Sequence, residues 1–388
     1  MKTRRTLSAV LAVMIALAIL VSCASTGKNN ADTSKATKFK VGPVSVVDLH
    51  GTWYEMGRQF GDLMKDELHD IYDFLQTIIA ANQGNSDKTD SIVEQQKTQT
   101  PYRICEFMKG AAETSGLTYD QIHMINAVER IGGLPHCSVA MAWGDYTDGS
   151  LVIGRNYDYA DYFSQIADDV AVTVYHPADG ALATATIGYV GEIYAVNAIN
   201  EAGIFLELNN GKPSANIKSP NYRFTGTTML FDIMFDADDL NDIDLFFNTT
   251  NSSSSSIINV ADSQKGVSYE WCPIDVKHGE SENPEGLLVS TNYFLNPEWD
   301  FPVPSDADSW NAISRRDNLL KLLEAKKGSV DVSVMQDIIT TPLEDGGAML
   351  DLTVYQLVVV PETFELWIRV IDADDDAWFS VDLLSLLK

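Results

Sequence analysis

Basic residues, cysteines and histidines are all scarce in this chain. Lys and Arg total 27 against 55 Asp and Glu over 388 residues, which gives a formal net charge of −28. Acidity of this size repels phosphate backbones, so it argues against nucleic-acid binding. Four cysteines are too few for a disulfide framework, and the six histidines include no pair at metal-ligand spacing in the sequence. We therefore expect neither a cofactor nor a catalytic metal.

Long hydrophobic runs are also missing, apart from one at the N-terminus. Three basic residues within the first five positions precede an apolar stretch over 9–21, which is too short for a confident membrane span. The stretch ends at residues 20–24 (LVSCA), which resemble a bacterial lipobox. This resemblance implies a lipoprotein signal peptide over 1–22, lipidation of Cys23, and anchoring to a membrane of the bacterial cell envelope on its extracytoplasmic side. The alternative is an ordinary cleaved signal peptide.

The rest of the chain reads as a tether followed by one domain. Residues 23–40 are rich in Ser, Thr, Asn, Lys and Ala without apolar periodicity, which is typical of a flexible tether. From 41 to 388 we find no second linker and no repeat of fixed period. This length is within reach of a large two-sheet domain, so we predict a single domain over 41–388.

Hydrophobic periodicity changes from helical to strand-like at Cys137. Apolar spacing predicts helices over 54–79, 102–111 and 118–129, the last opened by a capping box at Thr118. Strands are expected over 138–144, 151–155, 168–176, 182–188, 193–199, 203–209, 257–261, 266–272, 286–291, 353–360 and 364–370. Further helices are expected over 227–237, 240–248, 309–325 and 332–340. Two groups of strands with helices before, between and after them predict an α+β fold of packed sheets covered by helices.

A cysteine and an Arg-Asn-x-Asp cluster stand at opposite ends of one predicted hairpin. Cys137 heads the first apolar run, and Arg155 and Asp158 end the next, with Asp-Gly at 148–149 between the runs. A β-hairpin would bring thiol, guanidinium and carboxylate together. If the peptide bond before Cys137 were cut, the freed α-amine, with a reference pKa of about 7.7–8.0, could act as the base for the thiol. Asp158 could orient that amine, and Arg155 could stabilise the thiolate.

Each of these residues also has a structural interpretation. Cys137 alone could be a buried core thiol, and Arg155 to Asp158 alone could be a solvated turn with a salt bridge. Cys105 and Cys272 are either two buried thiols or one disulfide bridge.

Five motifs, in order over roughly residues 45–370, decide between these interpretations. They are residues 51–61 (GTWYEMGRQFG), the stretch 137–158, residues 199–209 (INEAGIFLELN), residues 290–293 (STNY) and the Ser-Arg pair at 314–315. Together they resemble the N-terminal-nucleophile (Ntn) hydrolases, specifically the group of penicillin acyltransferase (peptidase C45), choloylglycine (bile salt) hydrolase and acid ceramidase. The resemblance implies a four-layer αββα sandwich.

The same resemblance implies a set of site residues. Cys137 would be the nucleophile and, after self-cleavage, would carry the amine base. Arg155 and Asp158 would support the nucleophile from beside it. Asn209 and Asn292 would stabilise the oxyanion, and Arg315 would hold in place the residues around the nucleophile. The neighbours Asn210 and Arg316 remain alternatives for Asn209 and Arg315.

Two features depart from the family pattern. His136 precedes the nucleophile where penicillin acyltransferase has a glycine, and residues 144–149 form an enlarged turn. Cleavage after His136 would divide the domain into a pro-segment over 41–136 and a chain over 137–388.

The function predicted from these features is a lipid-anchored amidase or acyltransferase. It would act on the linear carbon–nitrogen bond of a small-molecule N-acyl amide. A second hypothesis is a non-catalytic small-molecule-binding lipoprotein on the same fold. A third is a self-cleaving cysteine peptidase that acts on another protein.

Overall fold

The computed structural model describes residues 35–81, 86–132, 135–217, 226–281, 283–373 and 376–388. Residues Lys35–Lys388 form one compact unit. The predicted signal peptide over 1–22, the lipidation site Cys23 and the tether up to residue 34 lie outside the described residues. Within the described part, no helix has both the length and the hydrophobicity needed to cross a membrane.

The tether predicted over 23–40 is wrong at its C-terminal end. Strand β1 (Thr37–Val41) pairs antiparallel with β2 (Val44–Gly51), and Val41 lies opposite Val44. Gly42 takes φ +56 in the two-residue turn between them, a conformation that glycine adopts without steric cost. The strand was missed because the sequence of β1 is mostly polar. The Gly-Pro turn between the two runs is the local signal for the hairpin.

Two sheets form the centre of the fold. The larger sheet has the order β1-β2-β5-β6-β7-β8-β9-β10-β11, and the smaller has the order β12-β3-β4-β13-β14-β15. In the larger sheet the further strands are β5 (Val170–Pro177), β6 (Thr184–Tyr189), β7 (Asn197–Asn200), β8 (Phe205–Asn210), β9 (Ser256–Ala261), β10 (Gly266–Trp271) and β11 (Val276–His278). The smaller sheet has β12 (Leu287–Ser290), β3 (Ser138–Ala142), β4 (Val152–Asp158), β13 (Thr353–Val360), β14 (Glu365–Val370) and β15 (Phe379–Asp382). The pair β2 and β5 is parallel, and the other described pairs are antiparallel.

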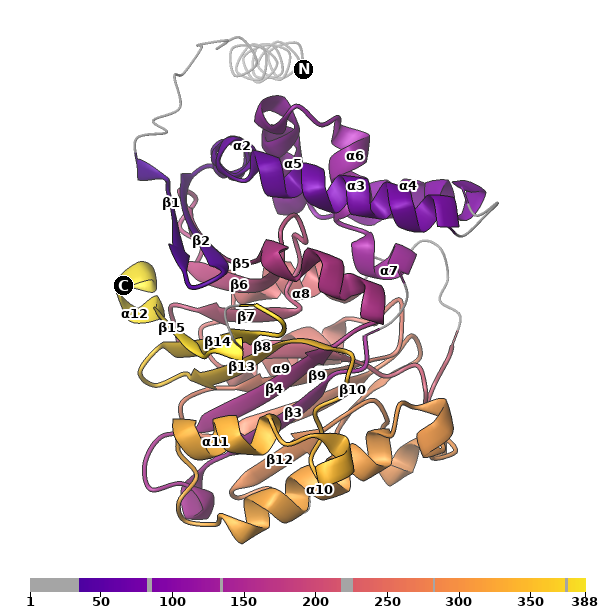
Figure 1. Cartoon of the computed structure of the whole chain (residues 1–388), viewed down its shortest axis with the longest axis vertical. Helices are drawn as coiled ribbons and strands as arrows, with labels where there is room; N and C mark the ends of the chain where they lie inside the picture. Colours follow the sequence, from indigo (N-terminus) through magenta and orange to yellow (C-terminus); the bar gives the residue numbers. More distant parts are fainter. Residues whose placement is uncertain (1–34, 82–85, 133–134, 218–225, 282, 374–375) are drawn as a thin grey trace, which may run out of the picture. The chain divides into compact units, whose positions relative to one another are not determined.

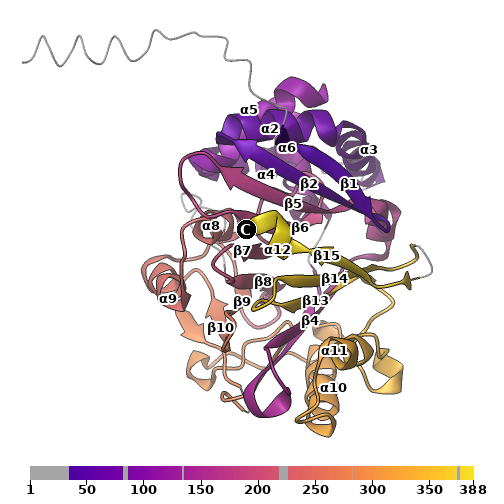
Figure 2. The ribbon, with the colours of Figure 1, turned by 90° about the vertical axis from the view of Figure 1, so that its left-hand side faces the viewer.

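Helices cover the outer faces of both sheets (Figure 1). Helices α10 and α11 pack on the smaller sheet, where Leu323 and Met335 join Ala140 in one apolar cluster, and Figure 2 shows them on the same side of β4. Helices α8 and α9 pack on the larger sheet around Leu206. The helices are α2 (Trp53–Leu63), α3 (Lys65–Ala81), α4 (Ser86–Gln99), α5 (Tyr102–Ser115), α6 (Tyr119–Ile125), α7 (Val128–Gly132), α8 (Gly226–Met234), α9 (Leu240–Thr249), α10 (Ala312–Ala325), α11 (Val332–Ile339) and α12 (Leu383–Leu387). Helix, sheet, sheet and helix layers are the α+β arrangement that the sequence predicted.

The helix predicted over 54–79 is two helices. Helix α2 ends at Leu63. The next residue, Met64, has non-helical dihedral angles (φ −111, ψ 26), and α3 begins directly after it. Met64 is itself fully buried, so the apolar periodicity continues through the break and hides it. The capping box at Thr118 is confirmed, since its side chain accepts from the backbone N–H of Gln121.

The motif over 51–61 packs two helices closely together. A capping box of Thr52 and Glu55 opens α2, and Gly57 and Gly61 then face α5. A Cβ atom at Gly57 would collide with the carbonyl oxygen of Phe107. The glycines of this motif therefore allow the backbones of α2 and α5 to approach each other.

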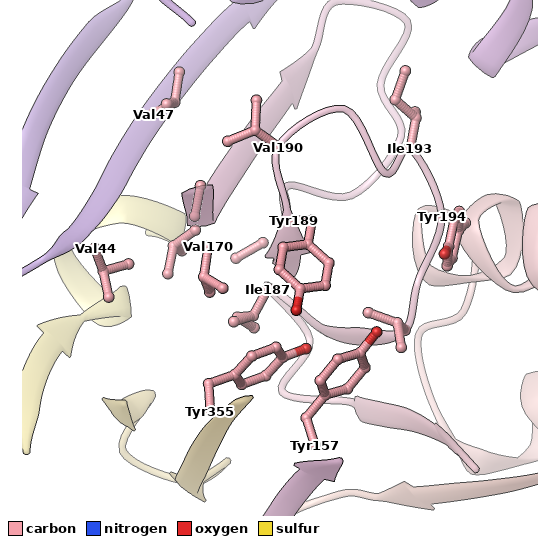
Figure 3. Close-up of a cluster of buried hydrophobic side chains, with 14 of the residues drawn as sticks. Val44, Val47, Tyr157, Val170, Ile187, Tyr189, Val190, Ile193, Tyr194 and Tyr355 are labelled. Carbon is pink, nitrogen blue, oxygen red and sulfur yellow. The ribbon is translucent and has the colours of Figure 1, made fainter. Parts of the chain in front are cut away.

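The space between the sheets holds an aromatic core (Figure 3). Tyr157 of β4 stacks on Tyr355 of β13 with ring centroids 4.4 Å apart, and Tyr189 of β6 meets Tyr157 edge-on. The Tyr355 hydroxyl accepts a 2.9 Å hydrogen bond from the Nδ2 of Asn197 in the larger sheet. These contacts fix β4, which carries Arg155 and Asp158, against the opposite sheet.

Candidate active site

The hairpin predicted around Cys137 is confirmed. Strands β3 and β4 pair antiparallel with Ser138 opposite Asn156, and the enlarged turn between them contains a short 3-10 helix, Gly144–Tyr146. The backbone N–H of His136 donates to the carbonyl oxygen of Asp158 at 2.8 Å. Cys137 therefore lies directly beside the end of β4, as the sequence spacing predicted.

All six predicted site residues are fully buried in the same region between the two sheets. Four structural elements bring them together, and three of these lie far from Cys137 in the sequence. They are the β3–β4 hairpin with Cys137, Arg155 and Asp158, the end of β8 with Asn209, the residues after β12 with Asn292, and helix α10 with Arg315.

Arg315 contacts the peptide bond that precedes the candidate nucleophile. Its Nη1 donates to the carbonyl oxygen of His136 at 2.6 Å and to that of Cys137 at 3.2 Å. A buried guanidinium makes strong, charge-assisted hydrogen bonds. The oxygen on which negative charge would develop during attack on the His136 carbonyl therefore faces a fixed positive charge.

Three further contacts hold Arg315 in place. Nη1 lies 3.3 Å from Oδ2 of Asp158, Nη2 donates to Oδ1 of Asn292 at 2.7 Å, and Nε donates to the Trp310 carbonyl at 3.0 Å. The Nδ2 of Asn292 in turn donates to the Asn210 carbonyl at 3.1 Å. Because both ends of its amide are engaged, Asn292 positions Arg315 in this structure.

The thiol and the carboxylate have shifted proton affinities. Burial raises the pKa of the Cys137 thiol to about 11, although the positive charge of Arg155 opposes the shift. Burial also raises the pKa of Asp158 to about 6, against the charge of Arg315 and a 2.6 Å hydrogen bond from Oγ1 of Thr353. In the uncut chain at neutral pH, the thiol is thus protonated and Asp158 is mostly ionised.

Arg155 links the two sheets across the site. Its Nη2 donates to the Leu208 carbonyl at 2.7 Å, its Nη1 donates to Oδ1 of Asn209 at 3.2 Å, and it forms an ion pair with Glu207. The second oxygen of Glu207 accepts from Nδ2 of Asn259. Glu207 is fully buried, and although it lies in the motif over 199–209, sequence reasoning gave it no role. The sequence feature that could have pointed to Glu207 is an acidic residue inside a predicted apolar strand, two positions before Asn209.

The structure distinguishes the adjacent candidates. Asn209 faces Arg155, whereas Asn210 does not; the Nδ2 atoms of both residues are buried with no hydrogen-bond partner among the described residues. Asn210 instead accepts from the backbone N–H of Lys212 in the following turn. Arg316 points to the Val289 carbonyl on β12, outside the site.

The sequence gave no signal for the residues that enclose the His136 ring. This ring stacks on Trp310 with centroids 3.3 Å apart. Trp310 and Asn311 both adopt positive φ values of 52 and 58, a strained conformation for residues with side chains. Burial, together with the charge of Arg315, lowers the pKa of His136 to about 3, so the ring is neutral.

The remaining cysteines form no bridge with each other. Cys105 and Cys272 are both free, Cys272 being buried and Cys105 half-buried. The disulfide alternative is therefore wrong, and the alternative of two buried thiols is confirmed for Cys272, whereas Cys105 is a free but half-buried thiol.

No family model matches the sequence. Among curated proteins, the chain is similar to protein dcd1A of Dictyostelium discoideum, with 26% identity over 196 residues. The match covers 41% of this chain and 44% of that protein, so the chain spans less than half the length of this relative.

The chain is also similar to several solved structures. One is a Caenorhabditis elegans ortholog of N-acylethanolamine-hydrolyzing acid amidase, with 17% identity and a TM-score of 0.44 over 62% of this chain and 96% of that one. A mutant of conjugated bile acid hydrolase from Clostridium perfringens has 12% identity and a TM-score of 0.46 over 64% and 93% of the two chains. Penicillin V acylase from Agrobacterium tumefaciens has 12% identity and a TM-score of 0.38 over 65% and 88%. The names of these three proteins describe an acid amidase, a bile acid hydrolase and a penicillin acylase.

Proposed function

We propose that this chain is an Ntn amidase that cleaves itself between His136 and Cys137 and then uses Cys137 to cleave a linear amide bond. The observation that carries the proposal is the 2.6 Å hydrogen bond from Arg315 to the His136 carbonyl. This carbonyl belongs to the bond that must break to free the amine of Cys137. A buried, preorganised donor at such an oxygen stabilises the charge that develops during attack.

Self-cleavage proceeds in two steps. The Cys137 sulfur attacks the carbonyl carbon of His136, a sulfur–carbon bond forms, the carbon–nitrogen bond breaks, and the thiol proton ends on the released amine. Water then hydrolyses the thioester, leaving a carboxylate on His136 and a free thiol on Cys137. The negative charge of Asp158 raises the pKa of the thiol, so the thiol proton leaves only as the sulfur–carbon bond forms, and the ionised carboxylate of Asp158 can accept it in that step.

Catalysis repeats this chemistry on a small-molecule amide. The α-amine of Cys137 takes the thiol proton, and the thiolate attacks the amide carbonyl. A sulfur–carbon bond forms, the substrate's carbon–nitrogen bond breaks, and the proton held by the α-amine passes to the leaving amine. Water or a second amine then releases the acyl group from the thioester and restores the thiol. Arg315 and the unbonded Nδ2 of Asn209 are the donors available to the oxyanion, with Asn292 positioning Arg315. Because Cys137 is fully buried in the uncut chain, substrate entry follows displacement of the new chain end at His136.

The proposal places the enzyme on the extracytoplasmic side of a bacterial membrane, held by a lipid on Cys23. Three features of the sequence support this location: the basic residues within the first five positions, the apolar stretch over 9–21 and the lipobox-like residues 20–24. Released products would then form outside the cytoplasm.

One observation favours the second candidate, a non-catalytic binding protein. The Cys137 thiol is sealed from solvent, and burial raises its pKa to about 11. If the chain is never cut, no amine forms and the thiol stays protonated. The buried set of Arg155, Asn209 and Arg315 would then serve binding alone.

Intact mass and a denaturing gel distinguish the two candidates. The parent protein, a Cys137→Ala variant and a Cys272→Ala control are compared, because Cys272 is also a buried thiol but lies outside the site. We expect two fragments that meet at His136–Cys137 in the parent and the control, and one chain in Cys137→Ala. An uncut parent would overturn self-cleavage and favour the binding protein. Cut protein is then screened against N-acyl amides and peptides, which separates an amidase from a peptidase.

A further inference from the structure

Three residues with metal-binding side chains gather where strands β2 and β5 end. Asp48, His50 and His176 each offer one ligand atom, and these atoms lie within 4.8 Å of one another. His50 is directly opposite His176 in the parallel register of β2 and β5. Asp48 shares the face of His50, because alternate residues of a strand point to the same side.

The carboxylate of Asp48 lies between the two imidazoles. Its Oδ2 is 3.1 Å from Nε2 of His50, and its Oδ1 is 3.0 Å from Nε2 of His176. The two rings stack almost in parallel, with centroids 4.3 Å apart and an interplanar angle of 8°. Both Nε2 atoms therefore face the carboxylate of Asp48.

We propose that Asp48, His50 and His176 bind one divalent transition-metal ion of the Zn²⁺ class. Zn²⁺ prefers imidazole nitrogen and carboxylate oxygen at about 2.0–2.1 Å in a tetrahedron, whose ligand atoms are then about 3.3 Å apart. The two Nε2 atoms already lie 3.1 and 3.0 Å from the carboxylate of Asp48, each from a different oxygen. Because an imidazole holds a metal ion in its ring plane and the two rings are nearly parallel, binding of one ion requires one ring to rotate.

Exposure and charge favour such an ion. The side chains of Asp48, His50 and His176 are 17%, 30% and 26% exposed, so a water molecule can complete the coordination. The net charge of −28 also attracts cations to this protein.

The expected absence of a metal rested on sequence spacing alone. His50 and His176 are separated by more than a hundred residues, and the parallel pairing of β2 with β5 brings them together. The proposed metal site lies outside the candidate active site. A bound ion there would join strands β2 and β5.

A metal here would also bridge the two proposed fragments. Asp48 and His50 precede the cleavage point, and His176 follows it. This consequence rests on the proposed self-cleavage, whereas the metal site does not. Binding is therefore measured in a Cys137→Ala background, which stays uncut.

Isothermal titration of the chelator-treated protein with Zn²⁺ tests the site. We expect one ion per chain, with affinity reduced at least about tenfold in His50→Ala and His176→Ala, since each removes a ligand. Asp48→Asn keeps the side-chain shape and should also weaken binding. His278→Ala is the matched control, because His278 is 60% exposed and lies on β11. Co²⁺ in place of Zn²⁺ should give the visible absorption of a tetrahedral site.

The opposite results would overturn the proposal. If the protein takes up no Zn²⁺, or if His50→Ala and His176→Ala bind as tightly as the His278→Ala control, the three residues form a hydrogen-bonded cluster only. For the bridge, chelation of the cut parent should lower its Tm while leaving that of cut His50→Ala unchanged. Equal Tm shifts in both proteins would exclude it.

Discussion

Replacing Arg315 by lysine should slow self-cleavage without removing the positive charge. The guanidinium spans the carbonyls of His136 and Trp310 and the amide of Asn292, which a single ammonium nitrogen cannot reach together. Loss of one donor at a developing oxyanion costs about 100- to 1000-fold in rate, equivalent to about 2.7–4 kcal/mol. We expect Arg315→Lys to cleave more slowly by about this factor, because the 2.6 Å bond to His136 is the one at risk.

The assay follows the appearance of the new N-terminus at Cys137 by intact mass after refolding from denaturant. Arg316→Lys is the matched control, since Arg316 is the next residue of α10 and its Nε contacts the Val289 carbonyl instead. Circular dichroism and Tm establish that each variant is folded. If folded Arg315→Lys cleaves at the parent rate, the role assigned to this guanidinium is wrong.

Three further predictions concern protonation, ion pairing and packing. Because burial raises the pKa of Asp158 to about 6, the self-cleavage rate should fall as the pH drops through about 6 and its carboxylate takes up a proton; this inflection should vanish in Asp158→Asn, and its persistence there would assign it to another group. Glu207→Gln leaves the charge of a fully buried cation without its partner, which should lower the free energy of unfolding in urea by about 3–5 kcal/mol, whereas Glu298→Gln, in an exposed ion pair, should change it little; equal costs would contradict a tight buried pair. Gly57→Ala should lower stability by about 1–3 kcal/mol or more, because its Cβ meets the backbone of α5, while Gly149→Ala, with no atom within 4 Å of the added Cβ, should change the Tm little; a stable Gly57→Ala would show that α2 and α5 can separate without cost.

The predicted helices and strands agree best with the structure where each was predicted from the periodicity within its own segment. Strands β3 and β4, which follow Cys137, and helices α10 and α11 lie within a few residues of their predicted ranges. The differences arose where composition or periodicity misled. Strand β1 lies mostly within the predicted tether, and buried Met64 concealed the break between α2 and α3. Helix α4 was not predicted, because its sequence has few apolar residues.

The sequence by itself determined the order of elements and the hairpin that joins Cys137 to Asp158. Both depend on neighbours along the chain, where alternation, helical spacing and turn residues act directly. Motif resemblance added Asn209, Asn292 and Arg315 as candidates, but it could not show what each one touches.

Only the tertiary structure decided those contacts. Strand β8 and helix α10 reach the hairpin across the interior, so the bond from Arg315 to the His136 carbonyl and the ion pair of Arg155 with Glu207 have no local sequence signal. The pKa of Cys137 depends on burial by several elements at once. The pairing of His50 with His176 likewise exists only because β2 lies parallel to β5. Contacts between segments distant in the chain are set by sheet pairing and packing, which periodicity along one segment does not encode.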